Sequence, residues 1–168
     1  QWLKRGGVVM PMSQAEAMWL SFGGGFRQGG YPFAVKIATG KINAVSGEPW
    51  TAHLSRDPQD YIVIPEQPWL DGYCVEKGVI RQFVAMPLGQ GYSVEEQLTG
   101  EAEWGGVQIL VYPMKADRYE TLCVPEPLRC YAEPMPSEPI GLAPGGRMKQ
   151  EVYDDPYGLD AWDQRHFS

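Results

Sequence analysis

Residues 33–45 read FAVKIATGKINAV, and this stretch decides the fold class. Its two halves, Phe33–Ala38 and Lys41–Val45, are rich in apolar residues, as β-strands are. Between them stands Thr39-Gly40, and glycine supplies the positive φ angle that a two-residue hairpin turn requires. The sequence therefore predicts an antiparallel β-hairpin in this stretch.

Further short strands are predicted on both sides of the hairpin, separated by turn residues at intervals of roughly 10–15 residues. Val107–Tyr112 is nearly all apolar, and this pattern predicts a central strand. The segment from Pro87 to Gly91 is predicted to join two other strands as a second hairpin. The remaining strands are predicted at Val8–Met12, Ala17–Phe22, Tyr61–Ile64, Val79–Met86 and Tyr92–Leu98.

One helix and one extended segment complete the prediction. Lys115–Cys123 has apolar residues at helical spacing, and Pro125 follows it as a helix stop. Six prolines between Val124 and Pro144 exclude both a helix and a central strand there. We therefore expect this part of the chain to form a proline-rich extended strap.

Composition agrees with these patterns. The chain has 168 residues, 20 of them glycine and 15 proline, which excludes a coiled coil or a long-helix bundle. Hydrophobic residues make up 43% and charged residues 21%, as in a globular core. No apolar stretch approaches the ~20 residues that span a bilayer. The predicted fold is all-β, an antiparallel sandwich or flattened barrel of about 8–10 short strands, with a core over residues 1–123 and an acidic strap over residues 124–168.

Charge and motifs narrow the classes of partner. The net charge is −7, which disfavours nucleic acid and anionic membranes as partners. The glycine run at residues 23–25 is not followed by the Lys-Ser/Thr of a phosphate-binding loop, and Gly89-x-Gly91 lacks the third glycine of a dinucleotide-binding motif, so no cofactor is predicted. The ends at Gln1 and Ser168 look like cuts in a longer polypeptide or the ends of a processed product, and we expect the chain to be part of a longer one.

The three cysteines are predicted to be free thiols. Their number is odd and they form no Cys-x-x-Cys pair, and a structural zinc site is disfavoured. A bridge between Cys123 and Cys130 stays open for an oxidising compartment and would leave Cys74 unpaired.

Paired carboxylates are the first candidates for chemistry. Glu95 and Glu96 are predicted to lie mid-strand, where neighbouring side chains point to opposite faces, so they cannot form one catalytic dyad. Glu96 falls on the more apolar face, and Arg81 is its predicted partner. A glycoside hydrolase would need a second carboxyl roughly 5–10 Å away, and Asp71 or Glu101 could supply it, although the spacing does not require either.

The acidic and aromatic residues near the C-terminus are the most distinctive group. Four carboxylates stand within residues 153–163 and are candidate calcium ligands, although the order of ligands in an EF-hand is absent. The aromatic side chains among them would either anchor the segment to the sheet or dock it on a basic groove of a partner. The candidate metal ligands are Asp154, Asp155, Asp160 and Asp163, and the aromatic residues are Tyr153, Tyr157 and Trp162.

Tryptophans in predicted loops complete the candidate binding residues. Trp50 and Trp69 stand beside prolines and turns, and Trp104 precedes Gly105-Gly106. Such rings pack into a core, anchor a protein interface or stack on sugars. Because no catalytic constellation accompanies them, the leading hypothesis is a non-enzymatic binding or assembly module with a protein partner or a second copy. The alternative is a carbohydrate-binding module or, less favoured, a glycoside hydrolase.

Overall fold

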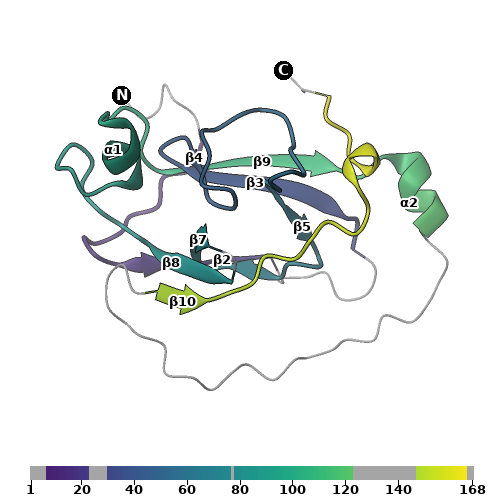
Figure 1. Ribbon diagram of the computed structural model, residues 1–168, viewed down its shortest axis with the longest axis horizontal. Coiled ribbons are helices and arrows are strands. Elements are labelled where there is room, and N and C mark those ends of the chain that lie inside the picture. The colour runs from purple at the N-terminus through teal and green to yellow at the C-terminus, as the bar shows by residue number, and fades with distance from the viewer. Residues whose placement is uncertain (1–6, 23–29, 77, 123–146, 166–168) are drawn as a thin grey trace.

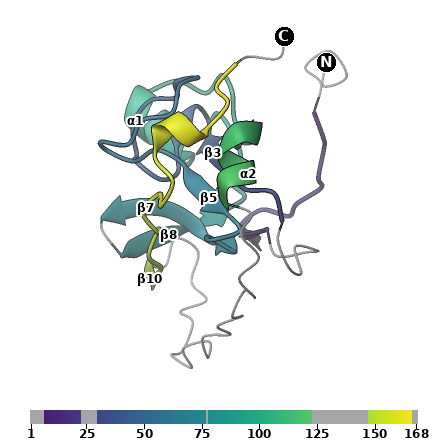
Figure 2. The same ribbon diagram turned by 90° about the vertical axis from the view of Figure 1, so that its right-hand side faces the viewer.

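The protein is an antiparallel β-sandwich with short helices at its two ends, as a computed structural model of the chain shows (Figure 1). The structure describes residues 7–22, 30–76, 78–122 and 147–165. Two sheets form separate layers in both views (Figures 1 and 2). The predicted all-β fold is confirmed. The Pro-rich segment 124–144, with Cys123 and Cys130, lies outside the described residues.

The first sheet is built on β3 (Phe33–Thr39), which is its central strand. One edge of β3 pairs with β9 (Val107–Pro113) over its full length. The other edge pairs with β4 (Ile42–Asn43) and β5 (Ile62–Ile64). Gly40 and Lys41 form the turn between β3 and β4, with φ angles of 54° and 64°. The predicted hairpin therefore forms, but its turn lies one residue later than the predicted Thr39-Gly40, because Thr39 is still paired with Ile42.

The second sheet is built on β8 (Val79–Val84). β8 pairs with β7 (Gly72–Glu76) on one edge and with β10 (Arg147–Lys149) on the other, and its last two residues pair with β1 (Ala17–Met18). A separate two-stranded ladder joins β2 (Leu20–Ser21) and β6 (Trp69–Leu70). The helices are α1 (Val94–Thr99), α2 (Ala116–Leu122) and a 3-10 turn, η2 (Leu159–Ala161).

Three strand predictions were wrong, and one helix prediction is confirmed. Tyr92–Leu98 is not a strand, because Ser93 and Glu96 form a capping box that starts α1, and Gly100 ends it in a left-handed conformation. β8 therefore forms its hairpin with β7. No strand forms at residues 8–12. Among the described residues β9 pairs with β3 alone and so lies at an edge of its sheet, where a central strand was predicted. The predicted helix near residues 115–123 is α2.

Both faces of β3 are buried, by different parts of the chain. Its odd-numbered residues face the second sheet, where Val35 and Ile37 pack with Phe83. Its even-numbered residues face the loop between β4 and β5 and the C-terminal residues, where Ala34 packs with Trp162. A bridge between Met114 and Trp162 fixes these C-terminal residues beside the end of β9. Described residues of the acidic C-terminal segment are thus part of the core.

A buried ion pair fixes the covering loop to β3. Lys36 is fully buried, and its Nζ donates to Oδ2 of Asp60 at 2.6 Å, to the carbonyl of His53 at 2.6 Å and to Oγ1 of Thr51 at 3.1 Å. Nζ also lies 5.5 Å from the ring centroid of Trp50. All three ammonium protons have acceptors, which offsets the cost of removing the charge from water.

Removing one member of this pair is expected to destabilise the protein strongly. Asp60→Ala leaves the Lys36 charge buried and unpaired, so we expect the free energy of unfolding to fall by about 3–5 kcal/mol. Urea denaturation measures the change, with Asp57→Ala as the control because Asp57 is exposed in the same loop. The double variant Lys36→Met with Asp60→Leu should recover most of the loss. A loss under about 1 kcal/mol for Asp60→Ala would contradict this role.

Candidate functional site

The outer edge of β9 is the main candidate site. Gly40 N–H donates to the Gly106 carbonyl, and Met114 N–H donates to the Pro32 carbonyl, so the even-numbered residues of this ladder bond to β3. The N–H and C=O groups of Val107, Ile109 and Val111 consequently point away from β3. Among the residues that the structure describes, β9 pairs with no other strand.

The side chains along this edge are apolar and exposed. Val111 and Ile109 stand opposite Val35 and Ile37 of β3, so they lie on the face that forms the inter-sheet core. Yet Val107, Ile109 and Val111 are 37%, 49% and 53% exposed. The core face of the first sheet therefore continues past the second sheet and ends in a stripe of three β-branched residues. We call the outer edge of β9 together with these side chains the β9 edge.

The loop before β9 is held in place by a buried carboxylate. Glu95 on α1 is only 4% exposed. Its Oε1 accepts N–H groups from Glu103 at 3.0 Å and Trp104 at 2.9 Å, and its Oε2 accepts that of Gly105 at 2.8 Å. Burial alone would raise the pKa of Glu95, but the three N–H groups outweigh it and hold the pKa below its ordinary value.

A glycine in the β3–β4 turn makes room for this carboxylate. A Cβ atom on Gly40 would stand 2.4 Å from Cβ of Glu95, and φ of Gly40 is 54°. Both the left-handed backbone and the close approach of α1 therefore require glycine at this position. The hairpin that the sequence predicts thus also supports the loop that carries Trp104.

Two of the three predicted loop tryptophans meet at Lys41. Its Nζ lies 4.8 Å from the ring centroid of Trp104 and 5.8 Å from that of Trp50, within cation–π range. Trp104 is half exposed, at 51%. Trp69 lies apart from this pair in β6, and its Nε1 donates to Oδ2 of Asp71 at 3.1 Å.

Substituting the buried carboxylate should loosen the Trp104 loop in a pH-dependent way. Glu95→Gln replaces an acceptor with an amide that cannot accept all three N–H groups, so we expect a loss of about 1–3 kcal/mol at neutral pH. Because the folded pKa of Glu95 is lowered, its contribution is present above the unfolded pKa and disappears as the pH falls through the folded pKa.

The difference in stability between wild type and Glu95→Gln should therefore shrink under acid conditions. Urea denaturation between pH 7 and about pH 3 measures it. The control is Glu101→Gln, since Glu101 is exposed and near the same loop. A difference that stays constant over this pH range would show that the Glu95 charge does not hold the loop.

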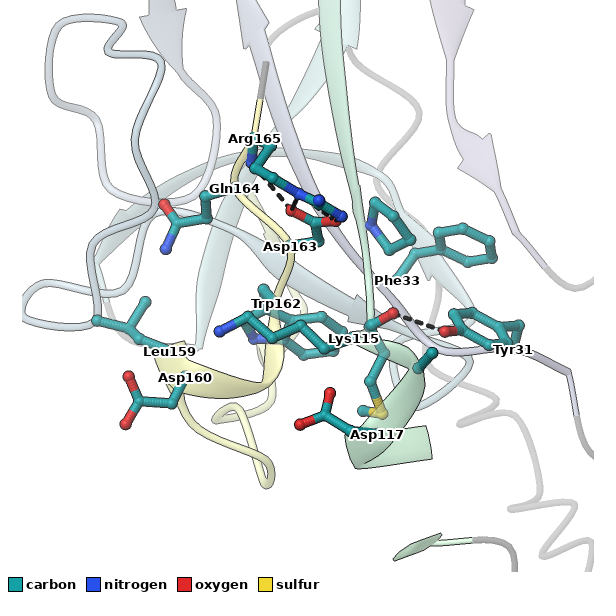
Figure 3. Close-up of a pocket in the computed structure, with 13 residues that line it drawn as sticks. Tyr31, Phe33, Lys115, Asp117, Leu159, Asp160, Trp162, Asp163, Gln164 and Arg165 are labelled. Atoms are coloured by element: carbon teal, nitrogen blue, oxygen red, sulfur yellow. Dashed lines mark hydrogen bonds and ion pairs between the residues drawn. The ribbon is translucent and has the colours of Figure 1, made fainter. Parts of the chain in front are cut away.

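The C-terminal acidic and aromatic residues bond to one another and to other residues of the chain, and Figure 3 shows one such contact, between Asp163 and Arg165. Trp162 is 1% exposed, and its Nε1 donates to Oδ2 of Asp155 at 3.0 Å. The same oxygen accepts Tyr61 Oη at 2.5 Å, and Oδ1 accepts Tyr157 N–H at 2.8 Å. Burial, together with the Asp155 hydrogen bond, raises the pKa of Tyr61. Of the three aromatic residues predicted here, Tyr153 is the exposed one.

The four carboxylates predicted as metal ligands are not brought together. Both carboxylate oxygens of Asp155 accept the hydrogen bonds described above. Asp163 forms an ion pair with Arg165, and this pair lowers the pKa of Asp163 to about 2. Asp154 and Asp160 are exposed. Within residues 7–22, 30–76, 78–122 and 147–165, no group of three or more His, Cys, Asp or Glu side chains is placed to hold a metal ion.

The carboxylates considered for hydrolysis also have local roles. Glu96 accepts the N–H of Gly91 at 2.8 Å and Oγ of Ser93 at 2.6 Å, as the end of the capping box. The Ser93 hydroxyl is the main reason that the pKa of Glu96 is lowered. The predicted pairing of Glu96 with Arg81 is wrong, because Glu96 lies in a helix cap and not in a strand beside β8. Asp71 accepts from Trp69, and burial raises the pKa of Asp71.

Sequence reasoning missed the two features that define the candidate site. The edge position of β9 was not predicted, because apolar residues occupy both faces of the strand and this pattern is typical of a central strand. Glu95 was missed because residues 92–98 were interpreted as a strand. The Ser93-x-x-Glu96 pattern followed by Gly100 was a signal for the helix.

Comparison with known proteins adds no family assignment. No protein-family model matches the chain, and no curated protein or solved structure is significantly similar to it. None of the helices in the described ranges is both long and apolar enough to cross a membrane.

Proposed function

We propose that the chain is a non-enzymatic assembly module whose β9 edge pairs with the β9 edge of a second copy. The observation that carries this proposal is the row of outward N–H and C=O groups at Val107, Ile109 and Val111, on the same residues whose apolar side chains are exposed. An exposed strand edge with an apolar face is a template for adding another strand.

The β9 edge is complementary to itself about Ile109. In an antiparallel pair related by a two-fold axis, Ile109 of each copy stands opposite Ile109 of the other, and Val107 stands opposite Val111. Residues whose N–H and C=O groups point outward then face each other as hydrogen-bonded pairs. The same register places all their side chains on one face, so the two apolar stripes join into one.

The chemistry of the strand favours such pairing. Natural sheet edges are protected from pairing by charged residues, especially lysine, and by bulges. β9 reads VQILVYP and carries no charge, and its one proline stands at the final position. No like charges would therefore oppose each other across the strand pair. Trp104, which is 51% exposed and precedes the strand by three residues, supports the proposal because tryptophan is enriched among the residues that dominate binding at protein interfaces.

Charged residues at the two-fold axis give a direct test. Ile109→Lys places two ammonium groups opposite each other and removes two apolar side chains, so we expect dimer affinity to fall at least about tenfold. Ile109→Glu should act similarly. An equal mixture of the two variants should dimerise again, because opposite charges then meet. Sedimentation velocity over a hundredfold dilution series measures the mass in each case.

The control substitution is Trp19→Lys. Trp19 is 65% exposed and lies between β1 and β2, in the other layer. This variant should keep the wild-type mass at every concentration. Wild type that remains monomeric throughout the series, or a mixture of the Ile109 variants no heavier than either alone, would refute the proposal.

The carbohydrate-binding alternative has one observation in its favour, the meeting of Trp50 and Trp104 at Lys41. A sugar ring would stack on the exposed face of Trp104. Trp104→Ala should then abolish binding to a glycan array, while Trp69→Ala should leave it intact. Wild-type protein that binds no glycan on a broad array would eliminate this alternative.

A further inference from the structure

Residues of both sheets and of α1 line a groove. It lies at the end of the sandwich where Figure 1 shows α1. Its volume is about 720 Å³, within the range of small-molecule sites. The tip of the β3–β4 hairpin forms one side, β8 forms the other, and α1 borders it. The groove is distinct from the β9 edge, although Val107 borders both.

Most of the lining of this groove is apolar. Phe83 of the inter-sheet core forms part of it, and further apolar side chains come from α1 and from the segments before β1 and after β8. Methionines are prominent, and their flexible side chains adapt to apolar ligands of different shape. The methionines are Met12, Met18 and Met86.

Several polar lining groups already have partners in the protein. The hydroxyls of Thr39 and Tyr73 bond to each other. The side chain of Asn43 binds the Asp60 carbonyl and the Val45 N–H, and Glu95 is occupied by three backbone N–H groups. These groups line the wall without offering a free charge to a ligand.

Arg81 is different. It stands opposite Tyr73 in the β7–β8 ladder and two residues from Phe83, so its side chain lies on the groove face of β8. It is exposed, and no ion pair joins it to any residue in the described part of the chain. An apolar groove with one available guanidinium is complementary to an apolar ligand with one negative group.

We propose that this groove binds a single-chain amphiphile with a carboxylate head, such as a medium-chain fatty acid, with the carboxylate on Arg81 and the hydrocarbon chain along the methionine-rich wall. A guanidinium binds a carboxylate through two parallel N–H···O bonds, a geometry that neither an alcohol nor an amine head can reproduce. Arg81 therefore determines which head group is preferred, and the apolar wall determines how tightly the hydrocarbon chain binds.

Three ligands that differ only in the head group test this assignment. Isothermal titration calorimetry of the full chain with decanoate, decanol and decylamine, all below their aggregation concentrations, should rank decanoate tightest. We expect decanol to bind about tenfold more weakly and decylamine more weakly still. Arg81→Gln should remove the preference, so that decanoate and decanol bind alike.

The matched control is Arg118→Gln, because Arg118 is an exposed arginine on α2 and does not line the groove. It should keep the wild-type ranking. The proposal is overturned if wild type shows no saturable decanoate binding, if decanol binds wild type as tightly as decanoate, or if Arg81→Gln keeps the preference.

Protection of Cys74 locates the ligand independently. Cys74 lines the groove, and burial raises the pKa of its thiol to about 11, so its alkylation is slow and sensitive to access. In a chain carrying Cys123→Ser and Cys130→Ser, decanoate should slow maleimide labelling of Cys74 at alkaline pH, at the concentration at which it binds by calorimetry. Labelling that stays unchanged at saturation would place the ligand elsewhere and overturn the assignment.

Discussion

The burial of both faces of β3 is the constraint on which the rest of the structure depends. β3 is paired on both edges, and its residues from Ala34 to Ala38 are buried. A strand covered on both faces needs two covering layers, which are the second sheet on one side and the β4–β5 loop with the C-terminal residues on the other. The ammonium of Lys36 specifies the second of these layers, because its three acceptors lie at Thr51, His53 and Asp60.

This arrangement leaves β9 at the edge. β4 and β5 occupy one side of β3, and β9 occupies the whole of the other. The covering layer on the even-numbered face extends to β9, since Tyr112 and Met114 pack with Trp162. On the odd-numbered face the second sheet does not cover it, and Ile109 and Val111 stay half exposed. The proposed assembly surface is thus a consequence of how the core is distributed between the two faces.

Local sequence patterns correctly predicted the elements whose formation depends on neighbouring residues. The β3–β4 hairpin follows from Gly40 between two apolar runs, and α2 follows from helical spacing before a proline. Residues 92–98 were a local error, because alternating apolar residues were given more weight than the capping box of Ser93 and Glu96.

The candidate site was beyond prediction for a different reason. Whether a strand is central or at an edge depends on which distant strand pairs with it, and VQILVYP is compatible with both. The burial of Trp162 likewise depends on Asp155 and Tyr61, which are brought together only by tertiary structure. The predicted binding residues therefore divide into Trp50 and Trp104, which both lie within cation–π range of Lys41, and Trp162, which lies in the core.

The most direct measurement of the central claim is amide hydrogen exchange along β9 at two protein concentrations. Leu110 and Tyr112 donate toward β3, so their exchange should be slow at both concentrations. Val107, Ile109 and Val111 donate outward, so their exchange should be slow in concentrated solution and fast after dilution. Fast exchange of these three amides at every concentration, with Leu110 and Tyr112 still protected, would contradict pairing of the β9 edge.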